Sequence, residues 1–244
     1  MASHTYILFD IPTKAPQVCW SMNTWRTRLL LNYKGLDYKT EWLEYPNIGV
    51  RLGHHVPPNE QGPHFTLPAI QLPDGSYVMD SYKIADIIEE RHLEPRVHRL
   101  NIPAQLTFRN ILTNLMRQLT PLYIPGIAQR LLSNESIDFF IAARQKDVGM
   151  PLDEYGKQHG PGAFDRAEPF LHEMTALLDE TAGPYFLGDT VSYTDFIWAA
   201  ILLFFKCFGD DIYGELLMRS GNSQVHTEFL DALSQWTKRN DYLR

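Results

Sequence analysis

The chain has 244 residues, of which 44% are hydrophobic and 21% are charged, and this composition excludes a disordered or collagen-like polypeptide. Lysine and arginine total 22 against 29 aspartate and glutamate residues, which gives a formal net charge of −7. Nucleic acids and anionic membranes attract clustered positive charge, and the sequence has no basic run, so neither is expected as a partner.

The cysteines and histidines form no metal-binding pattern. Cys19 and Cys207 lie far apart and match no zinc or redox spacing. The nine histidines include no HxxxH pair and no mixed cluster with cysteine, so no metal site is predicted.

The first residues lack the charged lead and long apolar block of a secretory signal. We therefore expect a cytoplasmic protein with two free thiols.

The first 92 residues alternate strand-like and helix-like segments. The apolar run 6–9 predicts a strand, a helix with apolar positions at helical spacing follows a polar turn, and 38–45 alternates like a second strand. A strand, a helix and a strand in such a short stretch predict a parallel pair with a right-handed crossover. Residues 46–66, rich in proline, glycine and histidine, predict a loop with one short helix.

A hairpin and another helix complete this part. Residues 67–72 and 77–79 predict two short strands joined by a turn that contains Asp74-Gly75. Residues 82–90 have the amphipathic pattern of a helix, for which Ser81 is the candidate N-cap. The expected order is therefore β-α-β-α-β-β-α, in an α/β domain at residues 1–92.

The rest of the chain predicts helices alone. Residues 93–103 contain two prolines and no periodic pattern, so they are expected to be a linker. An all-helical domain is expected at 104–244, and its first helix is expected to end near Pro121 and Pro125. Its helices are predicted at 104–120, 135–147, 164–182, 192–208 and 224–238.

The predicted helix at 192–208 has a well-marked start. Ser192 and Asp195 have the spacing of a capping box, and Val191 and Phe196 have the spacing of a hydrophobic staple. We expect this motif to stabilise the fold rather than to take part in chemistry.

Two predicted helix starts carry polar residues. Ser21 and Asn23 lie where the first helix begins, and its unpaired N–H groups and dipole would stabilise an anion such as a thiolate. Asp80 and Ser81 lie at the start of the helix at 82–90, where Asp80 would hold an ammonium group and Ser81 a carboxylate. At both starts helix capping alone is the alternative role.

Pro68 opens a predicted strand. A proline there cannot donate a ladder hydrogen bond, and X-Pro bonds are mostly trans, so a trans strand-start proline is the default expectation. A cis bond would instead leave the backbone of Leu67 exposed, able to pair antiparallel with the peptide groups of a ligand.

Taken together, these motifs resemble one known family. Their order, ahead of an all-helical half, resembles the glutathione transferases over nearly the whole chain, and the capping box at Ser192 lies where the family has a similar box. The run at 21–28 and the long loop after the second strand resemble the fungal-specific class A transferases and the bacterial β-etherases. The motifs are Ser21-Met22-Asn23-Thr24-Trp25-Arg26-Thr27-Arg28, Leu67-Pro68-Ala69-Ile70 and Asp80-Ser81.

The resemblance implies a thioredoxin-like domain followed by a helical domain, glutathione as the co-substrate, no metal, and a homodimer. Ser21 and Asn23 are the implied catalytic residues, which would donate hydrogen bonds to the glutathione sulfur. In the omega class a cysteine occupies the place of Ser21, and its absence here removes the nucleophile for thiol transfer through a mixed disulfide. Cys19 lies two residues too early and is expected to be a small buried hydrophobe.

The resemblance also implies how glutathione is held. The backbone of Leu67, before Pro68, would pair with the cysteinyl unit, and Asp80 and Ser81 would bind the γ-glutamyl end. The omega-class lysine that binds the glycyl carboxylate is replaced here by His54.

Two further residues compete for that last role. His64 and Gln61 are the alternatives to His54, because a histidine is only partly charged near neutral pH.

An acceptor pocket is expected between the first helix and the helical half. Its candidate lining residues are apolar or aromatic: Met22, Trp25, Met116, Leu119, Tyr123 and Trp198. The predicted function is a detoxifying, serine-type transferase that activates the glutathione thiol for attack on hydrophobic or aromatic electrophiles or on aryl ethers. The alternative is a non-catalytic ligandin that binds aromatic metabolites such as plant polyphenols.

Overall fold

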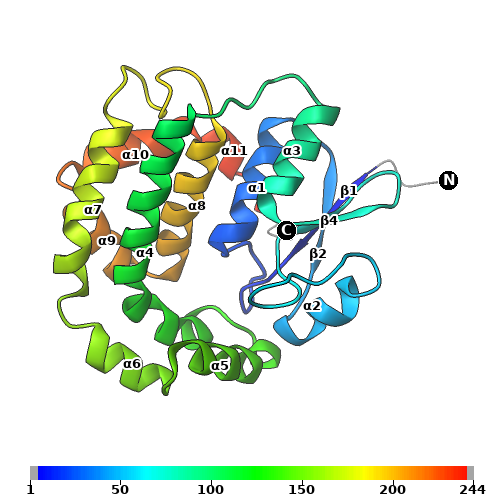
Figure 1. The fold of residues 1–244 in the computed structure, drawn as a ribbon, viewed down its shortest axis with the longest axis horizontal. Coiled ribbons are helices and arrows are strands. Elements are labelled where there is room, and N and C mark those ends of the chain that lie inside the picture. The colour runs from blue at the N-terminus through cyan, green and yellow to red at the C-terminus, as the bar shows by residue number, and fades with distance from the viewer. Residues whose placement is uncertain (1–4, 241–244) are drawn as a thin grey trace.

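The computed structural model describes residues 5–240, which form a sheet-containing part and a helical part (Figure 1). The elements of the first part are β1 Tyr6–Asp10, α1 Met22–Tyr33, β2 Tyr38–Trp42, α2 Tyr45–Leu52, β3 Ala69–Gln71, β4 Tyr77–Met79 and α3 Ser81–Arg91. The four strands form one sheet in the order β2-β1-β3-β4. β1 is parallel to β2 and antiparallel to β3, and β3 is antiparallel to β4. The predicted order of elements and the parallel first pair are confirmed.

The two faces of the sheet are covered by different helices, because successive side chains of a strand point to opposite faces. Leu8 and Ile70 belong to the main core with α1 and α3, whereas Phe9 and Ala69 belong to a smaller apolar cluster with α2. All four residues have no exposed surface. Figure 1 shows α1 and α3 on the side of the sheet that faces the helical part.

The helical part is built around α8, in which most residues are buried. Its elements are α4 Ile102–Arg130, α5 Asn134–Val148, α6 Leu152–His159, α7 Ala163–Leu178, α8 Tyr193–Phe208, α9 Asp210–Met218, α10 Ser223–Ala232 and α11 Ser234–Thr237. α8 packs against both α4 and α1, so it joins the two parts of the molecule. Within residues 5–240, no helix combines the length and the apolar character needed to cross a membrane.

The prediction that the first helix of this part ends near Pro121 and Pro125 is wrong. Both prolines lie inside α4, which continues to Arg130. Each proline removes one intrahelical hydrogen bond, but neighbouring helices pack closely here: a Cβ atom built on Gly156 of α6 would lie 3.0 Å from the Pro125 ring. Tertiary packing thus overrides the local tendency to break the helix, and the last turns of α4 bend towards α5 (Figure 1).

Two short helices, α6 and α9, were not predicted from the sequence. In addition, the predicted helix at 224–238 is divided into α10 and α11, with Leu233 as the C-cap of α10. The predicted linker 93–103 covers most of the connection between α3 and α4. The division into two separate domains stays a prediction.

The capping box of α8 is confirmed. The Asp195 carboxylate accepts hydrogen bonds from the Ser192 N–H at 2.7 Å, the Ser192 hydroxyl at 2.6 Å and the Phe186 N–H at 2.9 Å. Burial raises the pKa of Asp195 to about 6 against the opposing effect of these hydrogen bonds. The box therefore fixes both the start of α8 and the loop before it.

Candidate functional site

Ser21 caps the N-terminus of α1. Its backbone is extended, and its Oγ accepts a hydrogen bond from the Asn23 N–H at 3.3 Å. Its carbonyl accepts from the Trp25 N–H and from the Thr24 hydroxyl. A hydroxyl has one donor and two acceptor sites, so the Ser21 proton stays available for donation. The helix start predicted at this residue is confirmed.

The first turn of α1 offers further donors. Among residues 5–240, no acceptor pairs with the N–H of Met22 or of Thr24. The exposed Asn23 side-chain amide likewise makes no hydrogen bond within that range. These groups lie at the positive end of the helix dipole, where a negative charge is stabilised. An anion at this end of α1 would therefore meet several unpaired donors.

A second group of predicted residues meets at β3. The Asp80 N–H donates to the Pro68 carbonyl at 3.4 Å, beside the pair formed by Ala69 and Met79. The Leu67–Pro68 bond is cis, whereas trans was the default expectation. Within the described chain, the Leu67 amide and carbonyl make no backbone hydrogen bond, so an extended peptide can pair with them.

The N-cap of α3 is Asp80, not Ser81 as predicted. The Asp80 carboxylate accepts from the Tyr82 N–H at 2.8 Å and from the Lys83 N–H at 3.1 Å, and aspartate caps a helix as well as serine does. Ser81 is the first helical residue, is buried, and accepts the Tyr193 hydroxyl on its carbonyl at 2.8 Å. Asp80 has a φ of 91°, a positive value that few non-glycine residues adopt and that is enriched at functional sites.

A buried ion pair holds α1 against the sheet. Arg28 Nη2 donates to Asp10 Oδ2 at 2.8 Å, and both side chains have no exposed surface. The same guanidinium donates to the Thr40 hydroxyl at 3.0 Å and to the Tyr38 hydroxyl at 3.3 Å, while Asp10 Oδ1 accepts the Ile11 N–H. This pair was not predicted from the sequence, where its signals are an acid that ends an apolar strand and an arginine among apolar residues of a helix.

The starts of α1 and α3 lie close together. Arg26 of α1 and Asp80 line one cavity of about 570 Å³, and the charge of Asp80 acts on the Arg26 guanidinium. The structure thus brings the helix capped by Ser21 next to the residues predicted for a zwitterionic ligand.

The known proteins that this chain resembles share this arrangement of a sheet and helices. Residues 104–236 match the family model for the glutathione S-transferase C-terminal domain, and residues 20–91 match the model for the N-terminal domain. The chain belongs to the glutathione transferase family.

Three relatives of this transferase are fungal. The glutathione S-transferase-like protein ustS of Aspergillus flavus is 26% identical over 250 residues, which cover 93% of this chain and 89% of that protein. The crystal structure of glutathione transferase GSTFuA2 from Phanerochaete chrysosporium matches with 27% identity and a TM-score of 0.86, covering 98% and 100% of the two chains. The glutathione complex of CsGST63524 from Ceriporiopsis subvermispora matches with 26% identity and a TM-score of 0.84, covering 97% and 99%.

The residues predicted for the glycyl carboxylate are all exposed in this transferase. His54 follows α2, directly after its C-cap Gly53. His64 and Gln61 lie further along the loop between α2 and β3. Their exposure leaves each of them free to bind a carboxylate, and the choice between them stays a prediction.

Three of the residues predicted for the acceptor pocket lie in the core of the transferase. Leu119 and Trp198 have no exposed surface, and Trp25 is 4% exposed. Trp198 Nε1 donates to His226 Nδ1 at 3.2 Å, which directs the indole towards α10. Side chains with so little exposed surface support the helices rather than line an open pocket.

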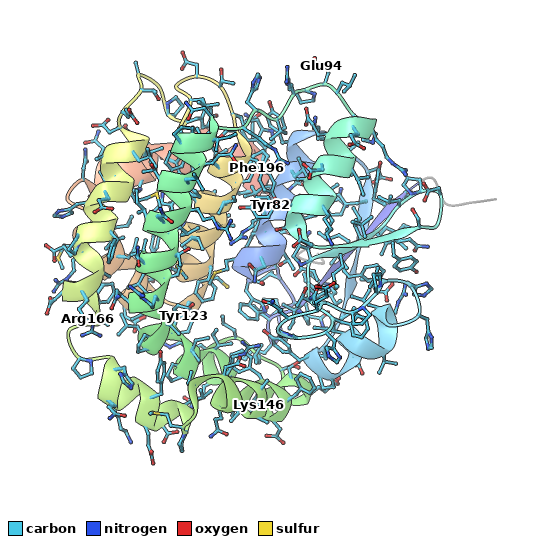
Figure 2. All side chains as sticks on the ribbon, in the orientation of Figure 1. Tyr82, Glu94, Tyr123, Lys146, Arg166 and Phe196 are labelled. Atoms are coloured by element: carbon cyan, nitrogen blue, oxygen red, sulfur yellow. The ribbon has the colours of Figure 1, made fainter. Side chains whose placement is uncertain are left out.

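The other three residues present more surface. Met22 at the start of α1 and Met116 on α4 are half-buried. Tyr123, labelled on α4 in Figure 2, is 8% exposed and packs edge to face on Phe204. Burial raises the pKa of Tyr123, so its hydroxyl stays protonated.

Cys19 is not placed to act as a nucleophile in the transferase. It is 2% exposed, its Sγ lies 3.4 Å from the Thr24 hydroxyl oxygen, and burial raises its pKa well above the ordinary value. A buried, protonated thiol is unreactive, since the thiolate is the nucleophile. Within residues 5–240, no cluster of three or more histidine, cysteine, aspartate or glutamate residues has a geometry suited to a metal ion.

Proposed function

We propose that this chain is a serine-type glutathione transferase, of the kind found among fungal-specific class A members and β-etherases, which activates the glutathione thiol. The observation that carries the proposal is Ser21, which caps α1 with its hydroxyl proton free. The unpaired N–H groups of Met22 and Thr24 and the amide of Asn23 add donors at the same end of the helix.

These donors would act on the ionisation of the thiol. A free thiol has a pKa of about 8.5, so only a few per cent is thiolate at neutral pH. A hydrogen bond from Ser21, with the dipole of α1, stabilises the thiolate and lowers that pKa. A decrease of two units corresponds to about 2.7 kcal/mol, the scale of one or two charge-assisted hydrogen bonds.

The reaction itself is a displacement or an addition. The thiol proton leaves to solvent, and the sulfur lone pair forms a bond to an electrophilic carbon of the acceptor. In an aryl ether the carbon–oxygen bond breaks, and the phenolate departs with its electron pair. Glutathione is consumed as co-substrate, and Cys19 takes no part, because it is buried and protonated.

The remaining contacts of glutathione are proposed from the resemblance to the family. The backbone of Leu67, beside Pro68, would pair with the cysteinyl unit, and the Asp80 carboxylate would hold the γ-glutamyl ammonium. The buried start of α3 at Ser81 offers the N–H and hydroxyl for the γ-glutamyl carboxylate. His54 would bind the glycyl carboxylate.

The acceptor would lie against the half-buried methionines. Met22 and Met116 come from α1 and α4, and thioether side chains adapt to ligands of different shapes. Tyr123 would contribute a protonated hydroxyl. We also propose that the protein forms a homodimer and is located in the cytoplasm.

Replacement of Ser21 by alanine tests the proposal. The variant removes one donor from the thiolate, so the pKa of bound glutathione should rise by about one to two units and turnover with a model electrophile should fall roughly 10- to 100-fold. Thiolate absorbance and initial rates measure the two quantities. Ser133→Ala is the matched control, because Ser133 is the N-cap of α5 in the helical part and touches no proposed ligand.

The Asn23→Ala variant separates the two donors. If it lowers turnover more than Ser21→Ala does, the asparagine amide is the main donor. Equal turnover in Ser21→Ala and the unmodified chain, with an unchanged thiol pKa, would show that Ser21 only caps the helix.

A second candidate is a ligandin without turnover. It is favoured by the bond from the Asn23 N–H to the Ser21 hydroxyl, which already gives Ser21 a capping role that needs no ligand. Calorimetry distinguishes the two functions. Micromolar binding of aromatic metabolites, with no heat and no reaction on addition of glutathione, would support the ligandin.

A further inference from the structure

Another cavity lies in the helical part, away from the proposed glutathione site. It is lined by residues of α4, α6 and the start of α7, and Figure 1 shows α6 and α7 at the edge of the molecule away from the sheet. Its volume is about 250 Å³, which is small for a pocket that binds drug-sized compounds. The side chains that line it are mostly polar: Arg117, Gln118, Pro121, Tyr155, His159 and Arg166.

Two arginines give this cavity an excess of positive charge. Neither Arg117 nor Arg166 forms an ion pair within residues 5–240, and no aspartate or glutamate of that range lines the cavity. Asp165, which precedes Arg166 on α7, is already paired with Arg219 at 2.7 Å. The His159 imidazole adds an N–H donor in either protonation state. An anion in this cavity would therefore meet cationic groups that no carboxylate neutralises.

Arg166 is held in place by uncharged acceptors. Its Nε donates to the Gln118 side chain at 3.2 Å, and its two Nη atoms donate to the carbonyls of Pro161 at 2.9 Å and His159 at 2.7 Å. These bonds leave two of its N–H groups without a partner among the described residues. They also fix the guanidinium beside the cavity, so it loses little conformational freedom when it binds an anion.

The wall on α4 also offers an acceptor. In an α-helix the carbonyl of Arg117 accepts the N–H of the residue four positions later, but that residue is Pro121, which has no N–H. Pro125 removes the donor of the Pro121 carbonyl in the same way, although that carbonyl lies against α6, 3.4 Å from a Cβ atom built on Gly156. The Arg117 carbonyl is therefore the one left for a donor group of a ligand.

The positive charge and the free acceptor together indicate a class of ligand. Two guanidiniums and an imidazole on three helices can each bind a different oxygen, which suits the terminal oxygens of a phosphate better than the two of a carboxylate. The Arg117 carbonyl suits a hydroxyl group of the same ligand. The small volume and the polar wall do not favour a large apolar body.

We propose that this cavity binds the phosphate monoesters of small hydroxylated compounds. The phosphate pairs with Arg117 and Arg166 and accepts the His159 N–H, and a hydroxyl of the ligand donates to the Arg117 carbonyl. The cavity shares no residue with the proposed glutathione site, so this proposal does not depend on the transferase reaction.

The test uses glycerol 3-phosphate with the full chain, titrated by phosphorus NMR at constant ionic strength. Arg117 is exposed and its side chain makes one hydrogen bond, to Asn114 at 2.9 Å, so Arg117→Met should fold normally and weaken binding about tenfold or more. Arg109→Met is the matched control, because Arg109 is an exposed arginine of the same helix that lies outside this cavity. No binding to the unmodified chain, equal affinity in Arg117→Met, or an equal loss in Arg109→Met overturns the proposal.

The Pro121→Ala variant tests the free acceptor. Alanine restores the N–H that pairs with the Arg117 carbonyl inside α4, so the affinity for glycerol 3-phosphate should fall several-fold. The affinity for inorganic phosphate, which has no carbon-bound hydroxyl, should stay unchanged and thereby show that the cavity is intact. Equal changes for the two ligands would overturn the assignment of a hydroxyl to this carbonyl.

Discussion

Asp80 combines two roles that a single substitution can separate. Its carboxylate caps α3 through the N–H groups of Tyr82 and Lys83, and it is also the residue proposed to hold the γ-glutamyl ammonium. Its φ of 91° lies in the left-handed region, which asparagine tolerates better than most residues. An asparagine oxygen also caps helices about as well as an aspartate oxygen.

We therefore expect Asp80→Asn to keep the fold and weaken glutathione binding. The loss of the negative charge should raise the KM for glutathione about tenfold, while the melting temperature changes little. Steady-state kinetics and thermal unfolding measure the two effects. Asp80→Ala is the comparison, because it should lose both the cap and the charge; a KM that rises in Asp80→Ala but not in Asp80→Asn would show that capping alone matters.

At the scale of elements, the sequence predicted most of the order of strands and helices but not several features that depend on tertiary contacts. The apolar run at 6–9, which predicted the first strand, and the capping box of α8 are local patterns, and both predictions are confirmed. The continuation of α4 through Pro121 depends on helices that pack against it. Local propensity contains no information on such packing.

The candidate site shows the same limit. The starts of α1 and α3 were visible in the sequence as local motifs. The N-cap of α1 is the predicted Ser21, whereas the N-cap of α3 is Asp80, one residue before the predicted Ser81. The pair formed by Asp10 and Arg28 was not visible, because it exists only once β1 and α1 are in contact. Trp198 was predicted to line the acceptor pocket, although an aromatic residue on an apolar helix can equally belong to the core. Its hydrogen bond to His226, which favours the core, depends on tertiary structure and is not visible in the sequence.

The contacts of α8 with its neighbours predict that the free energy of unfolding depends on pH. His226 and Asp195 make opposite contributions to this dependence. His226 Nδ1 accepts the Trp198 N–H, so Nε2 carries the proton and donates to the Thr175 hydroxyl at 2.8 Å. Burial lowers the pKa of His226 from 6.5 to about 4. The unfolded chain then binds more protons than the folded one between these values. The stability contribution of the neutral imidazole is therefore complete above pH 6.5 and is lost, by about 3 kcal/mol, as the pH falls to 4.

Asp195 acts in the opposite direction. Its pKa is raised from 3.8 to about 6, so the folded chain binds more protons in this range and is stabilised as the pH falls from 6 to 4. In urea unfolding at pH 4, 5 and 6.5, the destabilisation caused by His226→Gln should shrink by about 3 kcal/mol towards pH 4, whereas that caused by Asp195→Asn should grow by a similar amount. A destabilisation independent of pH in both variants would contradict the shifted pKa values.

At the scale of the whole molecule, the two parts are joined at the proposed glutathione site itself. The Tyr193 hydroxyl at the start of α8 donates to the Ser81 carbonyl at the start of α3, and both residues are buried. α8 also packs along α1, so the helix start that carries Ser21 and the one that carries Ser81 share one support from the helical part. The packing of the helical part should therefore affect the binding of glutathione as well as the binding of the acceptor.

Tyr193→Phe tests this connection. The variant removes the Tyr193 donor from the buried Ser81 carbonyl, which keeps its bond within the helix, so it should cost about 0.5–1.5 kcal/mol of stability and loosen the first turn of α3. We expect faster amide hydrogen exchange in that turn and a KM for glutathione raised several-fold, with kcat much less affected, because Ser21 is not touched.

Tyr185→Phe is the matched control, since the Tyr185 hydroxyl donates to the Ala232 carbonyl at 3.2 Å inside the helical part. Equal changes in KM for the two variants would show that the effect is general destabilisation, whereas a change confined to Tyr193→Phe would show that α8 positions the start of α3.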